Sequence, residues 1–330
     1  MTAQQNPASQ AATAKVADAV EGSWVNTHAP EWAVAYLQLS RLDRPIGSWL
    51  LLLPCWWGLF LASAQSGEFG LRDMWIFGGC AIGAILMRGA GCTWNDITDR
   101  KLDASVARTR SRPLPSGRLT TLNAYFWLLA QLVVAFLILV SFNRLAIALG
   151  VLSLLPVAFY PFAKRFTWWP QVFLGIAFNW GALLAWAAHG ESLTLAPALL
   201  YLGGIMWTLF YDTIYAHQDR TDDELVGIKS TARLFGDATP RWLHGFGLCA
   251  TALLAAAVAT ALVSHASLAV LIAALLGVAG FAAHLLFQAI RLDINDPASC
   301  LSAFRSNRNA GLALAVFLAL AAALSAMQSG

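Results

Sequence analysis

Long apolar runs recur along the chain, separated by short polar stretches. A helix needs about 20 apolar residues to cross the hydrocarbon core of a bilayer, so runs of this length predict transmembrane helices. The pattern predicts nine spans, over residues 46–64, 73–95, 119–140, 144–163, 168–189, 195–215, 242–263, 268–290 and 310–327. The sequence therefore predicts an all-α integral membrane protein.

The first 40 residues contain no such run. Residues 1–23 are rich in Ala, Gln and Ser, without the apolar core of a signal peptide or the arginines of a mitochondrial transit peptide. We expect a disordered or interfacial tail over residues 1–40, with a short interfacial helix over 32–42 leading into the membrane. The transmembrane domain then covers residues 41–330.

Composition and charge distribution refine this picture. Only 12% of the residues are charged, against about 25% in a typical soluble protein, which leaves too few charges to cover a water-facing surface. Of the 21 Lys and Arg residues, 18 fall in the segment before the first span and in the loops after the second, fourth, sixth and eighth spans. Because positive charge accumulates on the cytoplasmic side of a membrane, we expect the N-terminus and these four loops to face the cytoplasm.

Two groups of acidic residues follow spans that end on this predicted cytoplasmic side. The group after the second span is spaced at three- and four-residue intervals: Asn95, Asp96, Asp99 and Asp103. The group after the sixth span has a similar arrangement: Asp212, Asp219, Asp222 and Asp223. If each span continues as a helix, this spacing puts most of each group on one helix face.

Like charges at such spacing destabilise a helix, so a compensating cation is expected. Mg²⁺ favours carboxylate oxygens and keeps positions for water and substrate phosphates. One acidic loop alone is equally well explained as a solvated surface, but two such groups, four spans apart and on one side, favour a shared function. The sequence therefore predicts that these aspartates hold Mg²⁺ and a diphosphate.

Basic residues near the same side could bind the anionic part of a substrate. Lys164 and Arg165 end the fourth span, four residues after Tyr160, and Lys229 follows the second acidic group. Arg88 lies inside the second span, where a charge is a functional candidate by default. An ion pair between Arg88 and a carboxylate of the first acidic group is the structural alternative.

Several motifs together resemble the UbiA family of intramembrane aromatic prenyltransferases, over residues 36 to 326. The motifs are Arg-Leu-Asp-Arg-Pro-Ile-Gly at 41–47, the Asn-Asp-x-x-Asp-x-x-x-Asp pattern at 95–103, Arg-Pro-Leu-Pro-Ser-Gly at 112–117, the stretch 160–165, Tyr-Asp-Thr at 211–213 and Gly-Ile-Lys-Ser-Thr-Ala at 227–232. The last two motifs point to the branch of the family that acts on 4-hydroxybenzoate.

The resemblance implies about nine helices around a central cavity, with a cytoplasmic cap. The position of each acidic group after the second helix of a set of four also indicates two pseudo-repeated four-helix halves plus a final helix. The implied metal ligands are Asn95, Asp96, Asp99, Asp103, Asp219 and Asp223. The implied catalytic residues are Asp99, Asp103, Asp219, Asp223, Lys164 and Arg165, and the implied substrate-binding residues are Arg44, Arg88, Asn95, Tyr160, Lys164, Arg165 and Lys229. Lys164 would contact the diphosphate and Arg165 the benzoate carboxylate.

The implied reaction is Mg²⁺-dependent transfer of a polyprenyl group from polyprenyl diphosphate to the 3-position of 4-hydroxybenzoate, an early membrane step of ubiquinone biosynthesis. The expected location is a bacterial inner membrane, and we expect no nucleic-acid partner. Haem, homogentisate or a naphthoate remain alternative acceptors. A cation-coupled transporter is disfavoured, because its carboxylates would be expected near the membrane midplane rather than at its edge.

Overall fold

Every regular element in the described part of the chain is a helix. The computed structural model describes residues 22–106, 109–225 and 227–329, without the side chains of residues 221 and 222. Of the tail expected over residues 1–40, residues 1–21 lie outside this part, and the tail stays a prediction. The described part of the chain contains nine helical segments that are long and apolar enough to cross a membrane: Ile46–Ser66, Leu71–Ser105, Thr121–Leu139, Arg144–Phe166, Pro170–Gly190, Leu195–Asp219, Thr231–Leu262, Leu268–Arg291 and Pro297–Ser329. The prediction of an all-α membrane protein is confirmed.

The chain divides into two compact units, which are described separately. The first unit contains the residues up to Ser48 together with Ile82–Ile138, and the second contains Trp49–Ala81 and the residues from Leu139 onward. Helices α4 (Ile46–Ser66) and α5 (Leu71–Ser105) therefore each contribute to both units. The central cavity and the repeat of two four-helix halves stay predictions.

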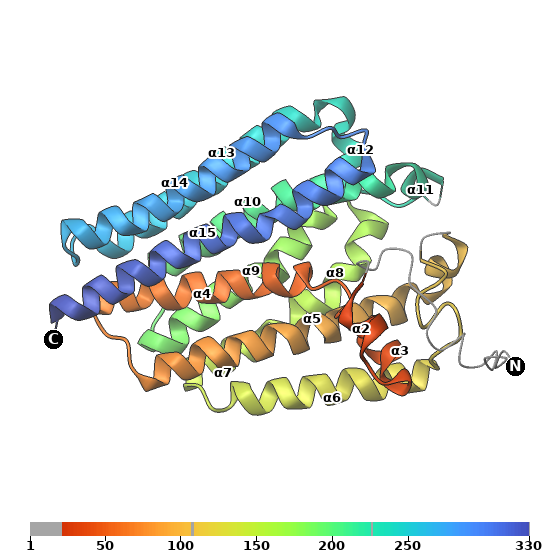
Figure 1. Ribbon diagram of the computed structural model, residues 1–330, viewed down its shortest axis with the longest axis horizontal. Coiled ribbons are helices and arrows are strands. Elements are labelled where there is room, and N and C mark those ends of the chain that lie inside the picture. The colour runs from red at the N-terminus through yellow and green to blue at the C-terminus, as the bar shows by residue number, and fades with distance from the viewer. Residues whose placement is uncertain (1–21, 107–108, 226, 330) are drawn as a thin grey trace, which may run out of the picture. The chain divides into compact units, whose positions relative to one another are not determined.

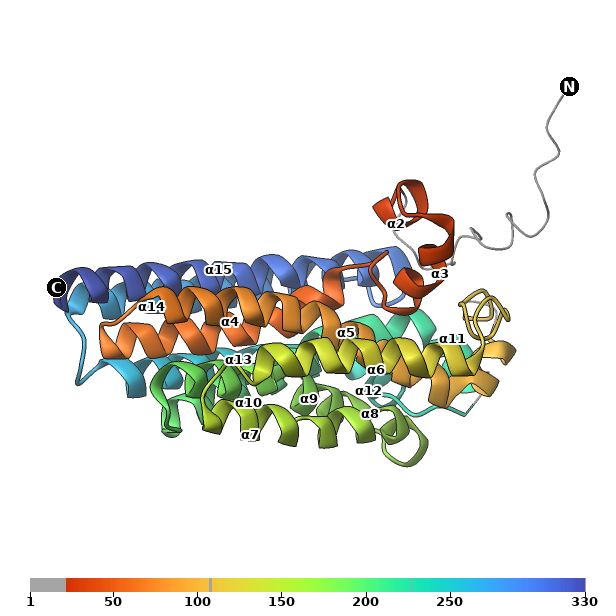
Figure 2. The same cartoon turned by 90° about the horizontal axis from the view of Figure 1, so that it is seen from below.

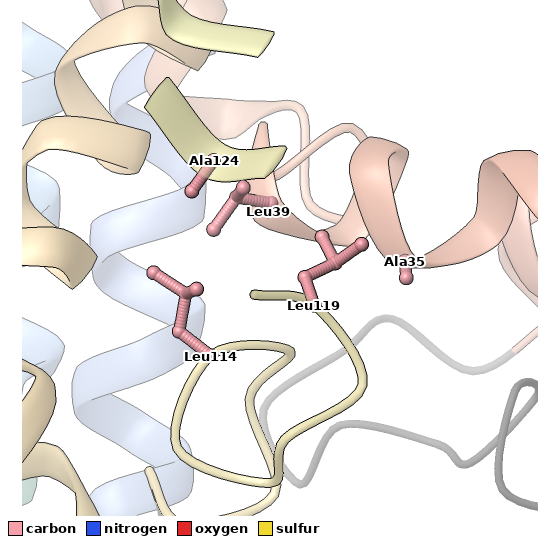
Figure 3. Packing of buried hydrophobic residues seen from close by; sticks show 5 residues of the cluster. All are labelled: Ala35, Leu39, Leu114, Leu119 and Ala124. Atoms are coloured by element: carbon pink, nitrogen blue, oxygen red, sulfur yellow. The ribbon is translucent and has the colours of Figure 1, made fainter. Parts of the chain in front are cut away.

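In the first unit, an amphipathic helix packs on a turn-rich loop. Helix α3 (Glu31–Leu39) follows the short helix α2 (Trp24–Thr27) and confirms the helix predicted over 32–42. Figure 3 shows how α3, the loop before α6 (Thr121–Leu139) and the start of α6 meet through apolar side chains, namely Ala35, Leu39, Leu114, Leu119 and Ala124. We call α2, α3 and residues 109–120 the cap of this unit.

Polar contacts also join the parts of this cap. Arg118 donates hydrogen bonds to the side-chain oxygen of Gln38 (2.7 Å) and to the carbonyl of Ser111 (2.8 Å). Gln38 in turn donates to Asn26 of α2 at 2.9 Å. Burial lowers the pKa of the Arg118 guanidinium, and the charge of Asp43 opposes this shift. The cap is thus ordered by buried contacts between segments that are distant in sequence.

In the second unit, α10 (Leu195–Ala216) packs against α9 (Pro170–Gly190), α13 (Thr239–Leu262) and α15 (Pro297–Ser329), and α14 (Leu268–Arg291) packs against α13 and α15 (Figure 1). Aromatic rings fill the contact: Trp57 and Trp207 are fully buried with centroids 5.0 Å apart, and Phe281 lies within 6.0 Å of both. Close packing of rings in a long-helix bundle supplies a rigid frame for the helix ends.

The fourth span differs from its prediction, because it consists of two helices. Helix α7 (Arg144–Leu152) ends at Leu152, and α8 (Leu154–Phe166) begins after the single residue Ser153 (Figure 2). Pro156 has no N–H to donate and its ring clashes with the carbonyl four residues earlier, which interrupts a helix at this point. The Ser153 hydroxyl, at the junction of the two helices, donates to the carbonyl of Gly150 at 2.6 Å. Helix α9 packs along both α7 and α8.

Candidate active site

The first acidic group lies on one continuous helix, as the spacing predicts. Helix α5 runs without a break to Ser105, so it carries Asn95 and all three aspartates of the group. Asp96, Asp99 and Asp103 are buried, with exposed fractions of 0%, 1% and 7%. Three carboxylates in such surroundings require positive charge close by.

Arginines supply part of that charge. Arg41 Nη2 lies 2.6 Å from Asp96 Oδ1, and Arg112 Nη1 lies 3.0 Å from Asp103 Oδ2 and 3.5 Å from Asp96 Oδ1. Neither arginine is among the catalytic, metal-binding or substrate-binding residues that the family resemblance implies. The available signal was that each begins a motif, Arg-Leu-Asp-Arg-Pro-Ile-Gly and Arg-Pro-Leu-Pro-Ser-Gly.

Two further predicted substrate-binding residues lie in the first unit. Arg88 on α5 lies against the backbone at the start of α4, where a Cβ atom added to Gly47 would come within 2.3 Å of its Nε. Only glycine at position 47 leaves room for this guanidinium. Arg44 pairs with the neighbouring carboxylate of Asp43, at 3.1 Å between Nη2 and Oδ2.

The second acidic group belongs to the second unit and is divided among three elements. Asp212 lies on α10, Asp219 in the 3₁₀ helix η1 (His217–Asp219), and Asp223 on α11 (Arg220–Leu225). The prediction treated 211–223 as one α-helix. A 3₁₀ turn advances about 120° per residue rather than about 100°, so Asp223 is rotated by roughly 60° from the predicted stripe. The side chain of Asp222 lies outside the described part of the chain.

A buried hydrogen bond accompanies this turn. His217 Nε2 lies 3.0 Å from the hydroxyl of Thr239 at the start of α13. Residues 220–223 are helical again, so Asp219 and Asp223 remain one turn apart and their side chains face the same side. The predicted pair of carboxylates is thus present on the short segment that follows α10.

The predicted cations of the second unit are brought together. Lys164 and Arg165 lie in the last turn of α8, and the backbone N–H of Lys229 donates to the Lys164 carbonyl at 3.2 Å. The Lys229 ammonium donates to the Phe166 carbonyl at 3.3 Å, and lies 5.9 Å from the ring centre of Trp168. Tyr160 lies one helical turn before Lys164 on the same helix. Lys164 and Lys229, 65 residues apart in sequence, therefore share one junction.

The Tyr-Asp-Thr and Gly-Ile-Lys-Ser-Thr-Ala motifs meet through their threonines. The hydroxyls of Thr213 and Thr231 are 2.7 Å apart and both residues are fully buried. The Thr231 N–H donates to the side chain of Gln171 on α9 at 3.3 Å. Helix α12 (Thr231–Phe235) is thereby fixed to α9 and α10, and with it the segment that presents Lys229 and Asp223. Sequence reasoning recognised both motifs but gave no role to Thr213 or Thr231.

The donor set suits a hard cation that is only partly held by protein. Among the described residues, no group of three or more His, Cys, Asp or Glu side chains gathers closely enough to hold a metal ion. Mg²⁺ commonly takes one or two carboxylates and completes its coordination with water and substrate phosphates. The pairs Asp99/Asp103 and Asp219/Asp223 each offer two carboxylates one helical turn apart, which fits that mode.

Comparisons with known proteins place the chain in a family. The profile of the UbiA prenyltransferase family matches residues 51–321. The chain is 49% identical over 280 residues to the mitochondrial 4-hydroxybenzoate polyprenyltransferase of Aedes aegypti, covering 84% of this chain and 61% of that protein. It is 48% identical over 285 residues to the protein of the same name from Bos taurus, covering 86% of this chain and 74% of that one.

A solved structure shares the fold. The UbiA homolog from Archaeoglobus fulgidus bound to GPP and Mg²⁺ superimposes with a TM-score of 0.65 at 17% identity, covering 89% of this chain and 99% of that one. The family profile spans most of the chain, and the sequence identity extends over the segments that carry both acidic groups. The chain therefore belongs to the UbiA prenyltransferase family.

Proposed function

We propose that the chain transfers a polyprenyl group from polyprenyl diphosphate to the 3-position of 4-hydroxybenzoate, an early membrane step of ubiquinone biosynthesis. The observation that carries the proposal is the near-50% identity, over most of the chain, to proteins named 4-hydroxybenzoate polyprenyltransferase. The geometry of the two acidic groups and of the Lys164–Lys229 junction supports it, because prenyl transfer requires that a diphosphate be bound and released beside an apolar phase.

The aspartates are proposed to hold Mg²⁺ on the substrate diphosphate. Asp99 and Asp103 would do so in the first unit, with Asn95 one turn earlier on α5, and Asp219 and Asp223 in the second. Bound Mg²⁺ would neutralise charge that develops on the diphosphate as its bond to carbon breaks. The UbiA homolog solved with GPP and Mg²⁺ supports divalent-metal use in this fold.

Cationic side chains are proposed to bind the two anionic ends of the substrates. The backbones of Lys164 and Lys229 meet at the end of α8, and both ammonium groups are proposed to bind the diphosphate. Arg165 is proposed to pair with the benzoate carboxylate, because a planar guanidinium matches a carboxylate in a bidentate fashion. Arg44, Arg88 and Tyr160 remain further proposed contacts to the substrates.

Loss of diphosphate leaves an allylic carbocation, which the carbon ortho to the phenol oxygen attacks before a ring proton is lost. Aromatic faces can stabilise such a cation. Trp207 and Tyr211 are both buried in the aromatic core, where the indole N–H donates to Asn307 at 2.8 Å and the phenol lies 3.0 Å from the Thr208 hydroxyl. Their contacts favour a packing role, and Tyr160, next to the cationic junction, is the better candidate for cation stabilisation.

The acceptor is tested with membranes that contain the full chain, Mg²⁺, one polyprenyl diphosphate and each candidate acceptor separately. Prenylation of 4-hydroxybenzoate, with no product from homogentisate, a naphthoate or haem, is the expected result. Product from one of the other acceptors, with none from 4-hydroxybenzoate, would retain the prenyltransferase chemistry and overturn the acceptor.

We further propose that both acidic groups face the cytoplasm of a bacterial inner membrane. The relatives above are named as mitochondrial, so the corresponding compartment in a mitochondrion would be the matrix. The distribution of basic residues supports the orientation. Single cysteines placed at residue 116 and at residue 69 in a cysteine-free chain test it: from the outside, a membrane-impermeant thiol reagent is expected to label only position 69.

A further inference from the structure

The four charged groups Arg41, Asp96, Asp103 and Arg112 form a buried cluster in the first unit, which we call the charge cluster. Both arginines reach the same oxygen of Asp96, at 2.6 and 3.5 Å, and Arg112 also reaches Asp103 at 3.0 Å. The exposed fractions of these side chains are 10% or less. Two positive and two negative charges balance within it, as buried charges require.

The backbone at Arg41 shows that the chain retains an unfavourable conformation there. Its φ of +60° lies in the left-handed region, at the end of α3 where the N–H of Leu42 bonds to the Leu37 carbonyl at 3.0 Å. Glycine is the usual residue at this position of a helix end, because it alone has no Cβ to clash. The ion pair with Asp96 compensates for this unfavourable backbone conformation, because the turn directs the Arg41 side chain to Asp96.

Arg112 stands between two acceptors on α5. One nitrogen, Nη1, is close to both Asp103 and Asp96. A guanidinium stays charged at any physiological pH, so it competes with any cation for the carboxylate that it contacts. A stronger contact between Arg112 and Asp96 therefore weakens the contact between Arg112 and Asp103, and leaves the Asp103 carboxylate more accessible to a metal cation.

We propose that Asp96 is a positioning residue, which holds Arg41 and shares Arg112 with Asp103, and so sets how strongly Arg112 competes with a divalent cation for Asp103. This inference rests on the proposed function, because it takes Asp103 as part of the metal site. It replaces the expectation that Asp96 is itself a metal ligand. The other oxygen of Asp96, Oδ2, is enclosed and accepts no hydrogen bond from the described residues, so direct ligation through Oδ2 is the rival to be tested.

The two roles predict opposite behaviour in a double variant. If Asp96 acts through Arg112, then Asp96→Asn leaves Arg112 to Asp103 alone and weakens cation binding. Removing Arg112 as well takes this competing positive charge away from Asp103, so binding recovers. If Asp96 is a ligand, its loss removes a coordinating oxygen as well as a charge. Removing Arg112 then restores only what its own charge cost, and binding stays weaker than in the parent chain.

The experiment measures Mn²⁺ binding by electron paramagnetic resonance on the purified full-length chain in detergent, with the metal as the only added ligand. Asp96→Asn is expected to weaken binding by about fivefold or more, and Arg112→Gln to tighten it by about threefold or more, as expected for one unit charge about 3–4 Å away at a partly screened site. The double variant Asp96→Asn/Arg112→Gln is expected to bind at least as tightly as the parent chain.

A fold control accompanies these variants, because Asp96→Asn removes a carboxylate that balances the charge of Arg41 in the charge cluster, and this loss can unfold the cap. Arg41→Gln/Asp96→Asn replaces the ion pair by two amides that can bond to each other, and is expected to weaken Mn²⁺ binding as Asp96→Asn does. Thermal unfolding of each variant identifies the folded ones, on which the comparison is made.

The outcomes separate this inference from the function beneath it. A double variant that binds more weakly than the parent chain, or an Arg112→Gln chain that binds no more tightly than the parent, overturns the positioning role and leaves the metal site in place. If the Asp99→Asn variant binds Mn²⁺ as tightly as the parent chain, both this inference and the proposed metal site are overturned. Recovery in the double variant supports the positioning role.

Discussion

Two residues of the first unit, Arg41 and Gly47, determine where charged side chains lie. Arg41 holds a left-handed backbone, and Gly47 leaves space for a guanidinium inside the membrane-spanning region. Both belong to the same seven-residue motif, which turns from α3 into α4. The motif therefore directs the side chain of Arg41 toward Asp96 on α5, and at Gly47 it leaves room for the side chain of Arg88 from α5. Each role predicts a substitution whose effect differs from that of an ordinary surface change.

The backbone conformation of Arg41 can be separated from its ion pair. Arg41→Gly and Arg41→Ala both remove the contact with Asp96, but only alanine retains a Cβ in the left-handed region. We expect Arg41→Gly to be more stable than Arg41→Ala by about 1 kcal/mol. Unfolding of both chains in mixed micelles measures the difference. Equal stability, or a more stable alanine variant, would show that position 41 adopts an ordinary conformation.

The fit of Arg88 against Gly47 can be tested with one methyl group. Gly47→Ala places a Cβ within 2.3 Å of the Arg88 Nε, and forcing that side chain aside is expected to cost about 1–3 kcal/mol of stability. If Arg88 contacts substrate, the KM for it should also rise. Gly83→Ala is the matched control, because a Cβ there meets no atom within 4 Å. A Gly47→Ala chain that behaves like Gly83→Ala would exclude the contact.

At the scale of elements, the structure explains why two distant motifs occur together. Tyr-Asp-Thr lies on α10 and Gly-Ile-Lys-Ser-Thr-Ala leads into α12, and the Thr213–Thr231 hydroxyl pair joins them. Arg233 on α12 donates to the carbonyls of Asp223 and Ile228, so the intervening segment is fixed at both ends. The threonines thus position a loop that carries charged groups, and do not need to touch substrate.

A double-variant cycle measures this link. Thr213→Val leaves the Thr231 hydroxyl buried without its partner and should cost about 1–3 kcal/mol, whereas adding Thr231→Val removes the second polar group and should cost little more. Hydrogen exchange of residues 223–230 should speed up in the single variant. Strictly additive effects of the two substitutions would show that the hydroxyls do not interact.

At the scale of the whole molecule, the sequence predicted what depends on local periodicity. The nine apolar helical segments and the continuation of α5 to Ser105 follow from apolar length and helical spacing. The pairing of Arg41 with Asp96, 55 residues apart, follows from tertiary contact and leaves no periodic trace. The 3₁₀ turn at His217 was missed for the same reason, because its hydrogen-bond partner Thr239 lies on another helix.

The break in the fourth span had a local signal that a hydropathy reading ignores. Pro156 lies within an uninterrupted apolar run, so length alone gave one helix, whereas its missing N–H ends α7 at Leu152. The candidate site likewise combines features that local sequence predicts with features that only the structure shows. Helical spacing selected the pairs Asp99/Asp103 and Asp219/Asp223, but the arginines that neutralise buried carboxylates in the first unit came only from the structure.

The central claim is that both aspartate pairs serve one prenyl transfer. Its most direct test is Mg²⁺-dependent formation of 3-polyprenyl-4-hydroxybenzoate from radiolabelled 4-hydroxybenzoate in membranes containing the parent chain, Asp99→Asn or Asp219→Asn. Asp237→Asn is the control, because Asp237 is an exposed aspartate in the short 3₁₀ helix before α13. We predict that Asp99→Asn and Asp219→Asn each lower the rate by about a hundredfold or more, since metal stabilisation is worth several kcal/mol, while Asp237→Asn keeps the parental rate. Mg²⁺-dependent prenylation that is retained in Asp99→Asn or in Asp219→Asn would contradict the account.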